Sequence, residues 1–494
     1  MPILTVRAEG GQAQEISFEG TPLLSEVLLA HGLAYAHPCG GRGSCGKCAV
    51  HLSGEVSPPS AAEVHAGTRL ACQARLQGNC EALLPALRQM SQIEVGEGAS
   101  VAAFQPAAGL FGAAVDIGTT TLALQIYELA TGRAVGSAAE QNPQTAIAAD
   151  VMGRIGAAMN GELGALCDML LHTLEKLLRR ACKQCGAAWE ELSMLVITGN
   201  TTMLYLLMGQ NPQALSHAPF DAERLFGEQI MLFGKPAYLP RCMSAFVGAD
   251  IACSVLASGM CEQGQTALLV DVGTNGEIAL WHENKLYVSS TAAGPAFEGS
   301  GIHMGCGSIA GAIDRVWLEK GEICIHTIGE APPVGLCGSG LIDAVAAFLR
   351  QEAVDETGAT EQQKLCLTPL VYLIPEDIRN VQLAKAAISA GICTLAQEVH
   401  VPLEKVERLY IAGGFGSHLN MESALAIGLF PMELRGRERV IGNASLYGAG
   451  MLLLSTPLMA RADDIARQAM TVPLGGSSRF AMHYMEQMCF PEAE

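Results

Sequence analysis

Four cysteines near the N-terminus have the spacing of ligands for an iron–sulfur cluster. Cys39, Cys45 and Cys48 lie close together, and Cys72 follows from a separate segment. This spacing is close to the plant-type [2Fe–2S] pattern, which has one residue fewer in its first gap. The loop between the first three cysteines is rich in glycine, and the missing Cβ atoms allow its backbone to curl tightly around a small cluster. The pattern predicts a [2Fe–2S] cluster bound by these four thiolates.

Two alternatives concern the metal and the fourth ligand. A structural zinc ion prefers two similar short pairs of cysteines, whereas this sequence has one tight triple and a single distant cysteine. The iron–sulfur cluster is therefore the favoured interpretation. Cys80 is near enough in sequence to replace Cys72, but residues 78–84 have the pattern of a final strand. We therefore expect Cys72 to be the fourth ligand.

Two later segments share a pattern that suits phosphate binding. In each, an apolar strand ends at an aspartate, Asp116 or Asp271, which is followed by an apolar residue, glycine and threonine. Such a turn presents backbone N–H groups and hydroxyls to phosphates, and the aspartate suits a Mg²⁺ ion held largely through water. Two ordinary hairpins are the alternative, which the recurrence of the pattern disfavours. The predicted phosphate-binding residues are Gly118, Thr119, Thr120, Thr121, Gly273, Thr274 and Asn275.

A third glycine-rich turn follows a buried strand at residues 408–412. Its flat backbone, with Gly413, Gly414 and Gly416, is expected to lie against a nucleotide base and ribose. Any strand-to-helix turn can contain glycine, so this signal has weight only beside the two phosphate-binding segments.

Two acidic residues are candidates for polarising an attacking water molecule. Asp150 and Glu298 are considered because that role needs an acidic group near the phosphates. A helix cap or a surface charge is the alternative for each. Two helices, predicted at residues 247–257 and 442–450, are rich in small residues, which suits either a hinge between two lobes or tight core packing.

The elements expected around these residues fall into two regions. Strands at 3–7, 14–18 and 48–52 and a helix at 23–31 surround the cysteine loop. From residue 111 onward, strands alternate with helices, the pattern of α/β domains. The repeated aspartate–glycine–threonine segments predict that this second region consists of two structurally related halves.

Length and composition limit the class of protein. A chain of 494 residues is too long for one core, and 50% hydrophobic with 16% charged residues suits well-buried α/β domains. A net charge of −19 disfavours nucleic acid as a partner. We find no apolar run long enough for a membrane helix and no secretory signal, so we expect a cytoplasmic protein. Most cysteines beyond residue 80 are expected to be buried small hydrophobic residues.

Both regions resemble known families. The first resembles the [2Fe–2S] ferredoxin family, which implies a β-grasp fold. The second resembles the actin, sugar kinase and heat-shock chaperone ATPase superfamily, which implies two ribonuclease H-like halves and bound ATP. By position, that resemblance implies that Asp116 and Asp271 hold the hydrated Mg²⁺ and that residues 413–415 line the adenosine. The implied domains are 1–88 (ferredoxin), 89–110 (linker), 111–262 (ATPase lobe I), 263–484 (lobe II) and 485–494 (tail).

The combination of the two regions resembles the reductive activators of corrinoid proteins. Similar stretches are residues 198–203, 293–301, 336–343 and 412–416. The resemblance implies ATP-dependent transfer of one electron from the [2Fe–2S] cluster to the Co(II) corrinoid of a partner protein in a methyltransferase system, which regenerates Co(I). It also implies an upstream low-potential electron donor, and a homodimer is a candidate assembly. The alternatives are a kinase or other ATPase with a structural or redox-sensing cluster, and a chaperone-like switch that transfers no electrons.

Overall fold

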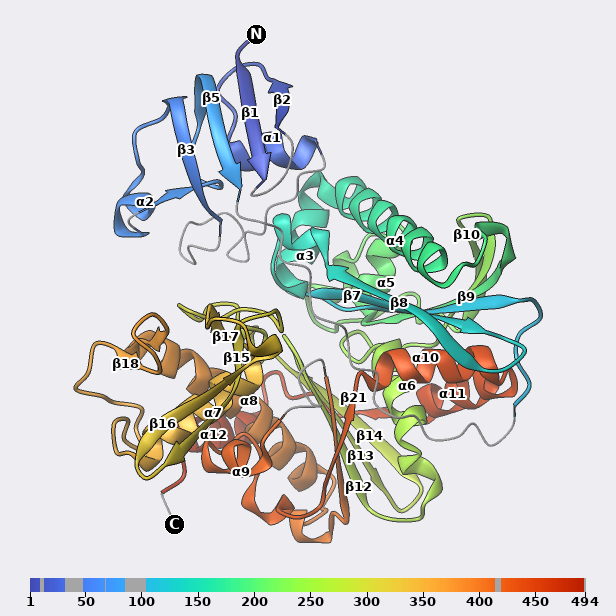
Figure 1. The fold of residues 1–494 in the computed structure, drawn as a ribbon. Coiled ribbons are helices and arrows are strands. Elements are labelled where there is room, and N and C mark those ends of the chain that lie inside the picture. The colour runs from blue at the N-terminus through green and yellow to red at the C-terminus, as the bar shows by residue number, and fades with distance from the viewer. Residues whose placement is uncertain (9–12, 32–47, 67, 85–103, 414–418, 493–494) are drawn as a thin grey trace.

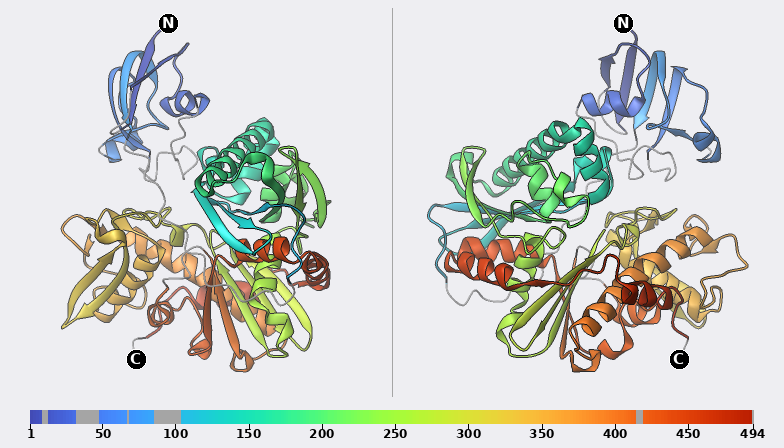
Figure 2. Two further views of the ribbon diagram at one scale, coloured as in Figure 1. Left: turned by 45° about the vertical axis from the view of Figure 1, so that its right-hand side comes forward. Right: turned by 180° about the vertical axis from the view of Figure 1, so that it is seen from behind.

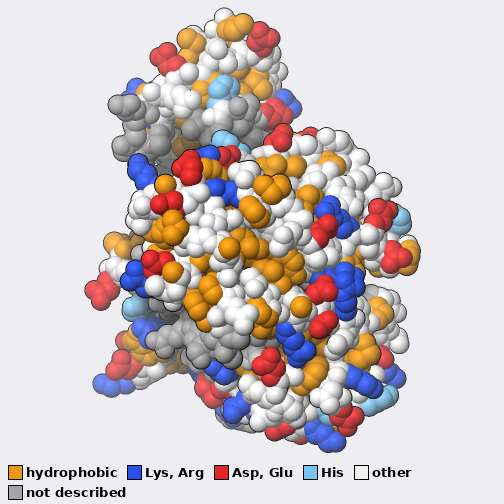
Figure 3. All heavy atoms as spheres, turned by 90° about the vertical axis from the view of Figure 1, so that its right-hand side faces the viewer, with side chains coloured by type: hydrophobic (Ala, Val, Ile, Leu, Met, Phe, Trp, Pro, Cys, Tyr) orange, Lys and Arg blue, Asp and Glu red, His pale blue; other side chains and the backbone are white. Residues whose placement is uncertain are grey.

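A computed structural model describes residues 1–8, 13–31, 48–66, 68–84, 104–413 and 419–492. Four residues with predicted roles, Cys39, Cys45, Gly414 and Phe415, lie outside these ranges. No helix among the described residues is both long enough and apolar enough to cross a membrane. On the face drawn in Figure 3, acidic and basic side chains are interspersed, so the net negative charge is not gathered into one patch there.

The N-terminal domain is a β-grasp sheet with one main helix (Figure 1). Its strands have the order β2-β1-β5-β3-β4, and β1 and β5 are parallel whereas the other pairs are antiparallel. Buried apolar residues of the strands pack against the helix, as Leu4 and Ile16 do with Leu24 and Leu28. The fold confirms the predicted ferredoxin-like domain. Its elements are β1 (Ile3–Ala8), β2 (Gln14–Ser17), α1 (Leu24–Ala30), β3 (Ala49–Val56), α2 (Ala61–Ala66), β4 (Arg69–Leu70) and β5 (Leu76–Leu84).

The second region, from residue 111 onward, contains two six-stranded sheets built on one plan. In each sheet, three consecutive strands form an antiparallel meander. Two later strands then extend the sheet next to the first strand of the meander and run parallel to it. This repetition confirms the prediction of two related halves. The first sheet has β6 (Phe111–Ile117), β7 (Thr121–Glu128), β8 (Arg133–Gln141), β9 (Leu192–Gly199), β10 (Glu228–Leu232) and β11 (Lys235–Leu239). The second has β12 (Ala267–Val272), β13 (Gly276–His282), β14 (Lys285–Thr291), β20 (Arg408–Ala412), β21 (Glu438–Gly442) and β22 (Met470–Thr471).

Helices cover the outer faces of both sheets and also separate the sheets from each other (Figures 1 and 2). Successive residues of a strand point to opposite faces of the sheet, so both faces can be covered by helices. Ala113 and Val115 of β6 pack on the outer helices, whereas Ala114 packs on the helices between the two sheets. The outer helices are α3 (Val151–Ala157), α4 (Leu163–Cys185) and α5 (Thr201–Leu207) on the first sheet, and α7 (Gly338–Arg350) and α8 (Pro375–Glu398) on the second. The middle layer has α6 (Ala249–Ser258) and α10 (Ala444–Leu454), with α11 (Pro457–Gln468) beside them.

Smaller elements complete the second lobe. They are β15 (Ala312–Glu319), β16 (Glu322–Thr327), β17 (Gly335–Leu336), β18 (Leu365–Cys366), β19 (Tyr372–Leu373), α9 (Met421–Ala426) and α12 (Ser478–Glu486). The predicted tail is packed against this lobe over its described part. Phe490 is buried, its N–H donates to Glu356 O, and Lys385 Nζ donates to Cys489 O.

The end of the predicted linker is attached to α10. The N–H groups of Gln105 and Ala107 donate to the carbonyl oxygens of Leu454 (3.0 Å) and Leu453 (2.8 Å). The N–H of Thr456 in turn donates to Gln105 O (3.0 Å). Residues 105–107 therefore lie in an extended segment that is hydrogen-bonded to the C-terminal end of α10.

The small residues of α6 and α10 allow a very close approach of the two helices. A Cβ atom at Gly448 of α10 would lie only 2.2 Å from the carbonyl oxygen of Cys253 in α6. The helices at 247–257 and 442–450 were expected to make either a hinge or a tight core contact, and they make a tight contact between the two sheets.

Replacing Gly448 with alanine is expected to destabilise the protein by about 1–3 kcal/mol, because overpacking a close contact costs that much. Thermal unfolding followed by circular dichroism measures the change. Gly156→Ala in α3 is the matched control, since no heavy atom lies within 4 Å of its Cβ position, and it should be neutral or slightly stabilising. Equal melting temperatures for Gly448→Ala and the unmodified protein would contradict the close packing of α6 on α10.

Candidate nucleotide and iron–sulfur sites

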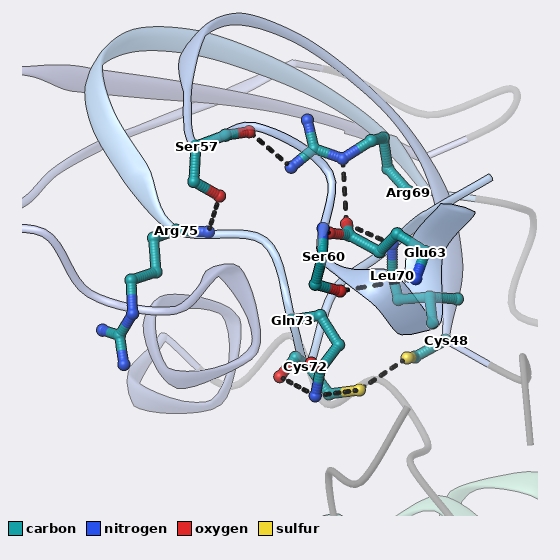
Figure 4. A network of polar contacts seen from close by, with 9 residues as sticks. All are labelled: Cys48, Ser57, Ser60, Glu63, Arg69, Leu70, Cys72, Gln73 and Arg75. Carbon is teal, nitrogen blue, oxygen red and sulfur yellow. Dashed lines mark hydrogen bonds and ion pairs between the residues drawn. The ribbon is translucent and has the colours of Figure 1, made fainter. Parts of the chain in front are cut away.

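Two of the four predicted cluster ligands lie within the described residues, and the fold brings them together. Cys48, just before β3, and Cys72, just after β4, are both buried, and their Sγ atoms are 3.3 Å apart (Figure 4). Thiolates bound to one tetrahedral metal with bonds of about 2.3 Å lie roughly 3.7 Å apart. The pair therefore fits two ligands of one metal ion in a cluster.

The structure separates Cys80 from this pair. Cys80 lies in the interior of the sheet on β5, opposite Leu4 of β1 and Gly54 of β3. Burial raises the pKa of its thiol to about 11, so it stays protonated. This position is that of a core residue, which supports Cys72 over Cys80 as the fourth ligand.

A buried carboxylate orders the segment that leads to Cys72 (Figure 4). Glu63 is only 2% exposed and accepts hydrogen bonds from Arg69 Nε (2.8 Å), Leu70 N (3.0 Å) and Ser60 N (2.8 Å). Burial alone would raise the pKa of Glu63, but the hydrogen bond from Arg69 and those from Ser60 and Leu70 outweigh it and lower the pKa. Glu63 was not identified from the sequence, although Ser60 and Glu63 have the spacing of a capping box, a signal that could have found it.

The two predicted phosphate loops are tight turns that face each other. Residues 118–120 join β6 to β7, and residues 273–275 join β12 to β13. The hydroxyl oxygens of Thr120 and Thr274 are 3.4 Å apart, although they belong to different lobes. The structure thus brings the two repeated segments into one site.

Buried polar side chains hold the first of these turns from behind. Asn142 is fully buried, and it donates from Nδ2 to Gly118 O and from its backbone N–H to Thr120 O, both at 2.8 Å. Arg154 is also fully buried and donates to Thr119 O and to Gln144 Oε1. Burial lowers the pKa of Arg154 to about 9. Neither residue was identified from the sequence, where each stands among unremarkable neighbours.

The two aspartates expected to hold Mg²⁺ lie at the ends of equivalent strands. Asp116 accepts hydrogen bonds from Asn443 Nδ2 and Ser445 Oγ, both at 3.1 Å, at the start of α10. Burial raises the pKa of Asp116 to about 6, although these two bonds lower it. Burial, followed by the charges of Asp116 and Glu298, raises the pKa of Asp271 to about 7.

Two further acids complete an acidic cluster, defined here as Asp116, Asp250, Asp271 and Glu277. Asp250 lies in the first turn of α6, and burial and then the charges of Asp116 and Asp271 raise its pKa to about 8. Glu277 of β13 is paired with Asp271 of β12, and its pKa lies well above the ordinary value because of burial and then Asp250 and Asp271. Both were missed, although a single acid inside an apolar helix or strand is a signal that could have identified them.

No group of three or more His, Cys, Asp or Glu side chains among the described residues converges closely enough to bind a metal directly. The acidic cluster instead places carboxyl groups on several sides of the site, and a bound cation would favour their ionised forms. Mg²⁺ usually keeps much of its water shell, so this arrangement fits an ion held through water better than one held in a cage of protein ligands.

The structure distinguishes the two candidates for polarising water. Glu298, half-buried in a short 3₁₀ helix (Ala296–Glu298), accepts hydrogen bonds from the hydroxyls of Thr120 and Thr274. Asp150 is exposed, and its side chain caps α3 by accepting from Gly153 N (2.7 Å). Glu298 therefore lies in the site, whereas Asp150 has the alternative role of a helix cap.

The third glycine-rich turn begins against the second phosphate loop. Gly413 has φ +115°, and a Cβ atom there would lie 2.6 Å from Val272 O and 3.1 Å from Asp271 Oδ1. Glycine is required at this position because any side chain would strike the end of β12. Gly413 is thus close enough to the acidic cluster to share a ligand with it.

The acidic cluster predicts a pH-dependent response to magnesium. Because the folded pKa values of Asp116, Asp271 and Asp250 are raised, their ionisation destabilises the metal-free protein as pH rises through about 6–8. Mg²⁺ favours the ionised forms, so its stabilisation should be larger at about pH 8 than at about pH 6. Melting temperatures with and without MgCl₂ at both pH values test this. An equal magnesium shift at both values would contradict it.

These features together define a class of protein: a [2Fe–2S] ferredoxin-like domain joined to a two-lobed, actin-like ATPase. Three family models match the chain: the 2Fe–2S iron–sulfur cluster binding domain over residues 8–77, the RACo middle region over 111–263, and the C-terminal (ASKHA) domain of RACo over 265–494.

Individual relatives agree with these matches. The corrinoid activation enzyme RamQ of Eubacterium limosum is 32% identical over 420 residues, which cover 77% of this chain and 70% of that protein. The [Co(II) methylated amine-specific corrinoid protein] reductase of Methanosarcina barkeri is 26% identical over 398 residues, 72% of each chain. A solved structure of a reductive activator for corrinoid, iron–sulfur protein superposes with a TM-score of 0.74 at 26% identity and covers 99% of this chain and 98% of its own. The chain belongs to the RACo family.

Proposed function

We propose that this protein is an ATP-dependent reductive activator that transfers one electron to the Co(II) corrinoid of a partner protein and so regenerates Co(I). One observation is central to this proposal: a single chain of the RACo family joins the thiol pair Cys48–Cys72 to an ATPase in which two phosphate loops meet across the lobes. The corrinoid is the substrate. A cytoplasmic location and a separate low-potential electron donor are parts of the same proposal.

In this proposal the N-terminal domain is the electron carrier. Cys39, Cys45, Cys48 and Cys72 bind the [2Fe–2S] cluster, which supplies one electron at low potential when reduced. Glu63 and Arg69 keep the segment before Cys72 in place, and Cys48 and Cys72 are themselves shielded from water by burial. The oxidised protein must be reduced again by the upstream donor before another turnover.

The ATPase region supplies the second requirement, energy. Plant-type clusters have potentials near −400 mV, and a Co(I) product is a stronger reductant still. Each ~59 mV of uphill one-electron transfer costs about 1.4 kcal/mol. Nucleotide binding and hydrolysis can offset this cost by changing how the two lobes hold the partner.

Specific residues have roles in this nucleotide site. Asp116 and Asp271 hold hydrated Mg²⁺, and Gly413 to Phe415 line the adenosine. Glu298, beside both phosphate loops, polarises the attacking water. The phosphates are bound by Gly118, Thr119, Thr120, Thr121, Gly273, Thr274 and Asn275.

A single assay tests the coupling. The protein is reduced chemically, freed of excess reductant and mixed anaerobically with a corrinoid protein in the Co(II) state. Formation of Co(I), followed by its absorption, should be fast with Mg-ATP and slow with Mg-ADP or without nucleotide. A rate of Co(I) formation that is the same in all three mixtures would refute the proposed coupling.

A further inference from the structure

The carboxylate of Glu298 joins the phosphate loops of the two lobes. The hydroxyl of Thr120, in lobe I, and the hydroxyl of Thr274, in lobe II, both donate to the same oxygen, Oε2, the second at 3.0 Å. The backbone N–H of Thr274 also donates to this carboxylate. Among the described residues, Glu298 thus accepts three hydrogen bonds from loops that were predicted to bind phosphate.

The surrounding backbone fixes Glu298 in this position. Gly299 has φ +78°, and a Cβ atom there would lie 2.5 Å from Cys306 O, so the turn after Glu298 is pressed against residues 305–306. On the other side, the Cβ position of Gly273 lies 3.4 Å from Glu298 Oε1, an ordinary van der Waals distance, so the carboxylate lies directly against the second phosphate loop. The position of Glu298 is therefore built into the fold and does not result from a freely rotating surface side chain.

The three donors cannot serve a carboxylate and a phosphate at once. A hydroxyl has one hydrogen, and a backbone amide has one, so each donates fully to a single acceptor at a time. A terminal phosphate oxygen needs the same hydroxyl and amide donors that Glu298 now occupies. A phosphate placed beside the carboxylate would also repel it, because both are negative.

We propose that Glu298 occupies the place of the terminal phosphate of ATP and thereby sets the discrimination between ATP and ADP. In the empty and ADP-bound protein, the carboxylate keeps Thr120 and Thr274 bridged. ATP must displace the carboxylate and take over both hydroxyls, which leaves Glu298 next to the terminal phosphate. This inference rests on the proposed function, because it requires a nucleotide at the two phosphate loops.

The test compares nucleotide affinities in two variants of the full-length protein. Glu298→Gln keeps the shape of the side chain and removes its charge, whereas Glu298→Ala also removes the acceptor. Binding of a non-hydrolysable ATP analogue and of ADP, each with Mg²⁺, is measured by calorimetry. Glu361→Gln is the matched control, since Glu361 is an exposed glutamate.

We expect Glu298→Ala to bind the ATP analogue about tenfold more tightly than the unmodified protein, the value of one charge-assisted hydrogen bond. Glu298→Gln should show a smaller gain, and the affinity for ADP should change by less than about threefold in both variants. Hydrolysis of ATP should nevertheless be slower in both variants, because each lacks the carboxylate that polarises the attacking water.

Three results would overturn the inference. Weaker binding of the ATP analogue, or equal changes for the analogue and ADP, would show that Glu298 does not compete with the terminal phosphate. Failure of the unmodified protein to bind any nucleotide would overturn the inference together with the proposed function. The melting temperatures of both variants are also measured, because a variant that melts well below the unmodified protein has changed its nucleotide affinity through misfolding.

Discussion

Cys72→Ala protein, purified anaerobically, is expected to lose its bound iron and all Co(I)-forming activity, while it still hydrolyses ATP. The buried Sγ atoms of Cys48 and Cys72 are 3.3 Å apart, so removal of one thiolate leaves an iron with an incomplete set of ligands. Cys72 is only one of many buried residues in the β-grasp core, and alanine removes a single sulfur atom, so the domain should remain folded. Iron and sulfide analysis, the visible absorption spectrum and the Co(I) assay measure the outcome.

Cys80→Ala is the matched control for this variant. Cys80 lies inside the same domain but in the interior of the sheet, and the change removes only a small buried side chain. It should retain two irons per chain and full activity. If Cys80→Ala lost the cluster and Cys72→Ala kept it, the assignment of the fourth ligand would be wrong.

Asp271→Asn should reduce ATP hydrolysis by about 10²–10³-fold, the usual effect of removing one preorganised electrostatic group. The aspartate lies at the end of β12, and its loss removes charge that the proposed Mg²⁺ site needs. Co(I) formation should then fall to the rate without nucleotide, while the visible spectrum of the cluster is unchanged. Phosphate release and the Co(I) assay measure the two effects.

The stability of Asp271→Asn distinguishes this result from simple unfolding. At about pH 8 the buried carboxylate of Asp271 is ionised, and this ionisation destabilises the folded protein because burial disfavours the charge. Without magnesium, the melting temperature of Asp271→Asn should therefore equal or exceed that of the unmodified protein. Asp464→Asn, the same change at an exposed position of α11, is the control and should leave hydrolysis unchanged. Normal hydrolysis in Asp271→Asn would remove this residue from the proposed magnesium site.

Much of the fold could be predicted from local patterns in the sequence. The repeated strand–aspartate–glycine–threonine segments indicated two related halves, and the strand orders of the two sheets confirm them. The cysteine spacing indicated the ferredoxin-like domain, and the β-grasp sheet confirms it. These signals were readable because each depends on residues that are neighbours in the chain.

The remaining parts of the site depend on contacts between distant segments. Arg154 binds Thr119 O from 35 positions away, and Asn443 binds Asp116 from 327 positions away. No spacing rule connects such partners. Asp250 was overlooked for a related reason: its helix was interpreted through its small residues, and the acid in its first turn was not considered.

Helix α10 makes hydrogen bonds at both of its ends, to the nucleotide site at its start and to the end of the predicted linker at its C-terminus. Its first turn contacts Asp116, and its last carbonyl groups accept hydrogen bonds from residues 105 and 107, where the chain arrives from the ferredoxin-like domain. Eleven helical residues form a stiff rod about 16 Å long. A tilt of α10 at its Asp116 end would therefore also displace residues 105–107, which are hydrogen-bonded to its other end.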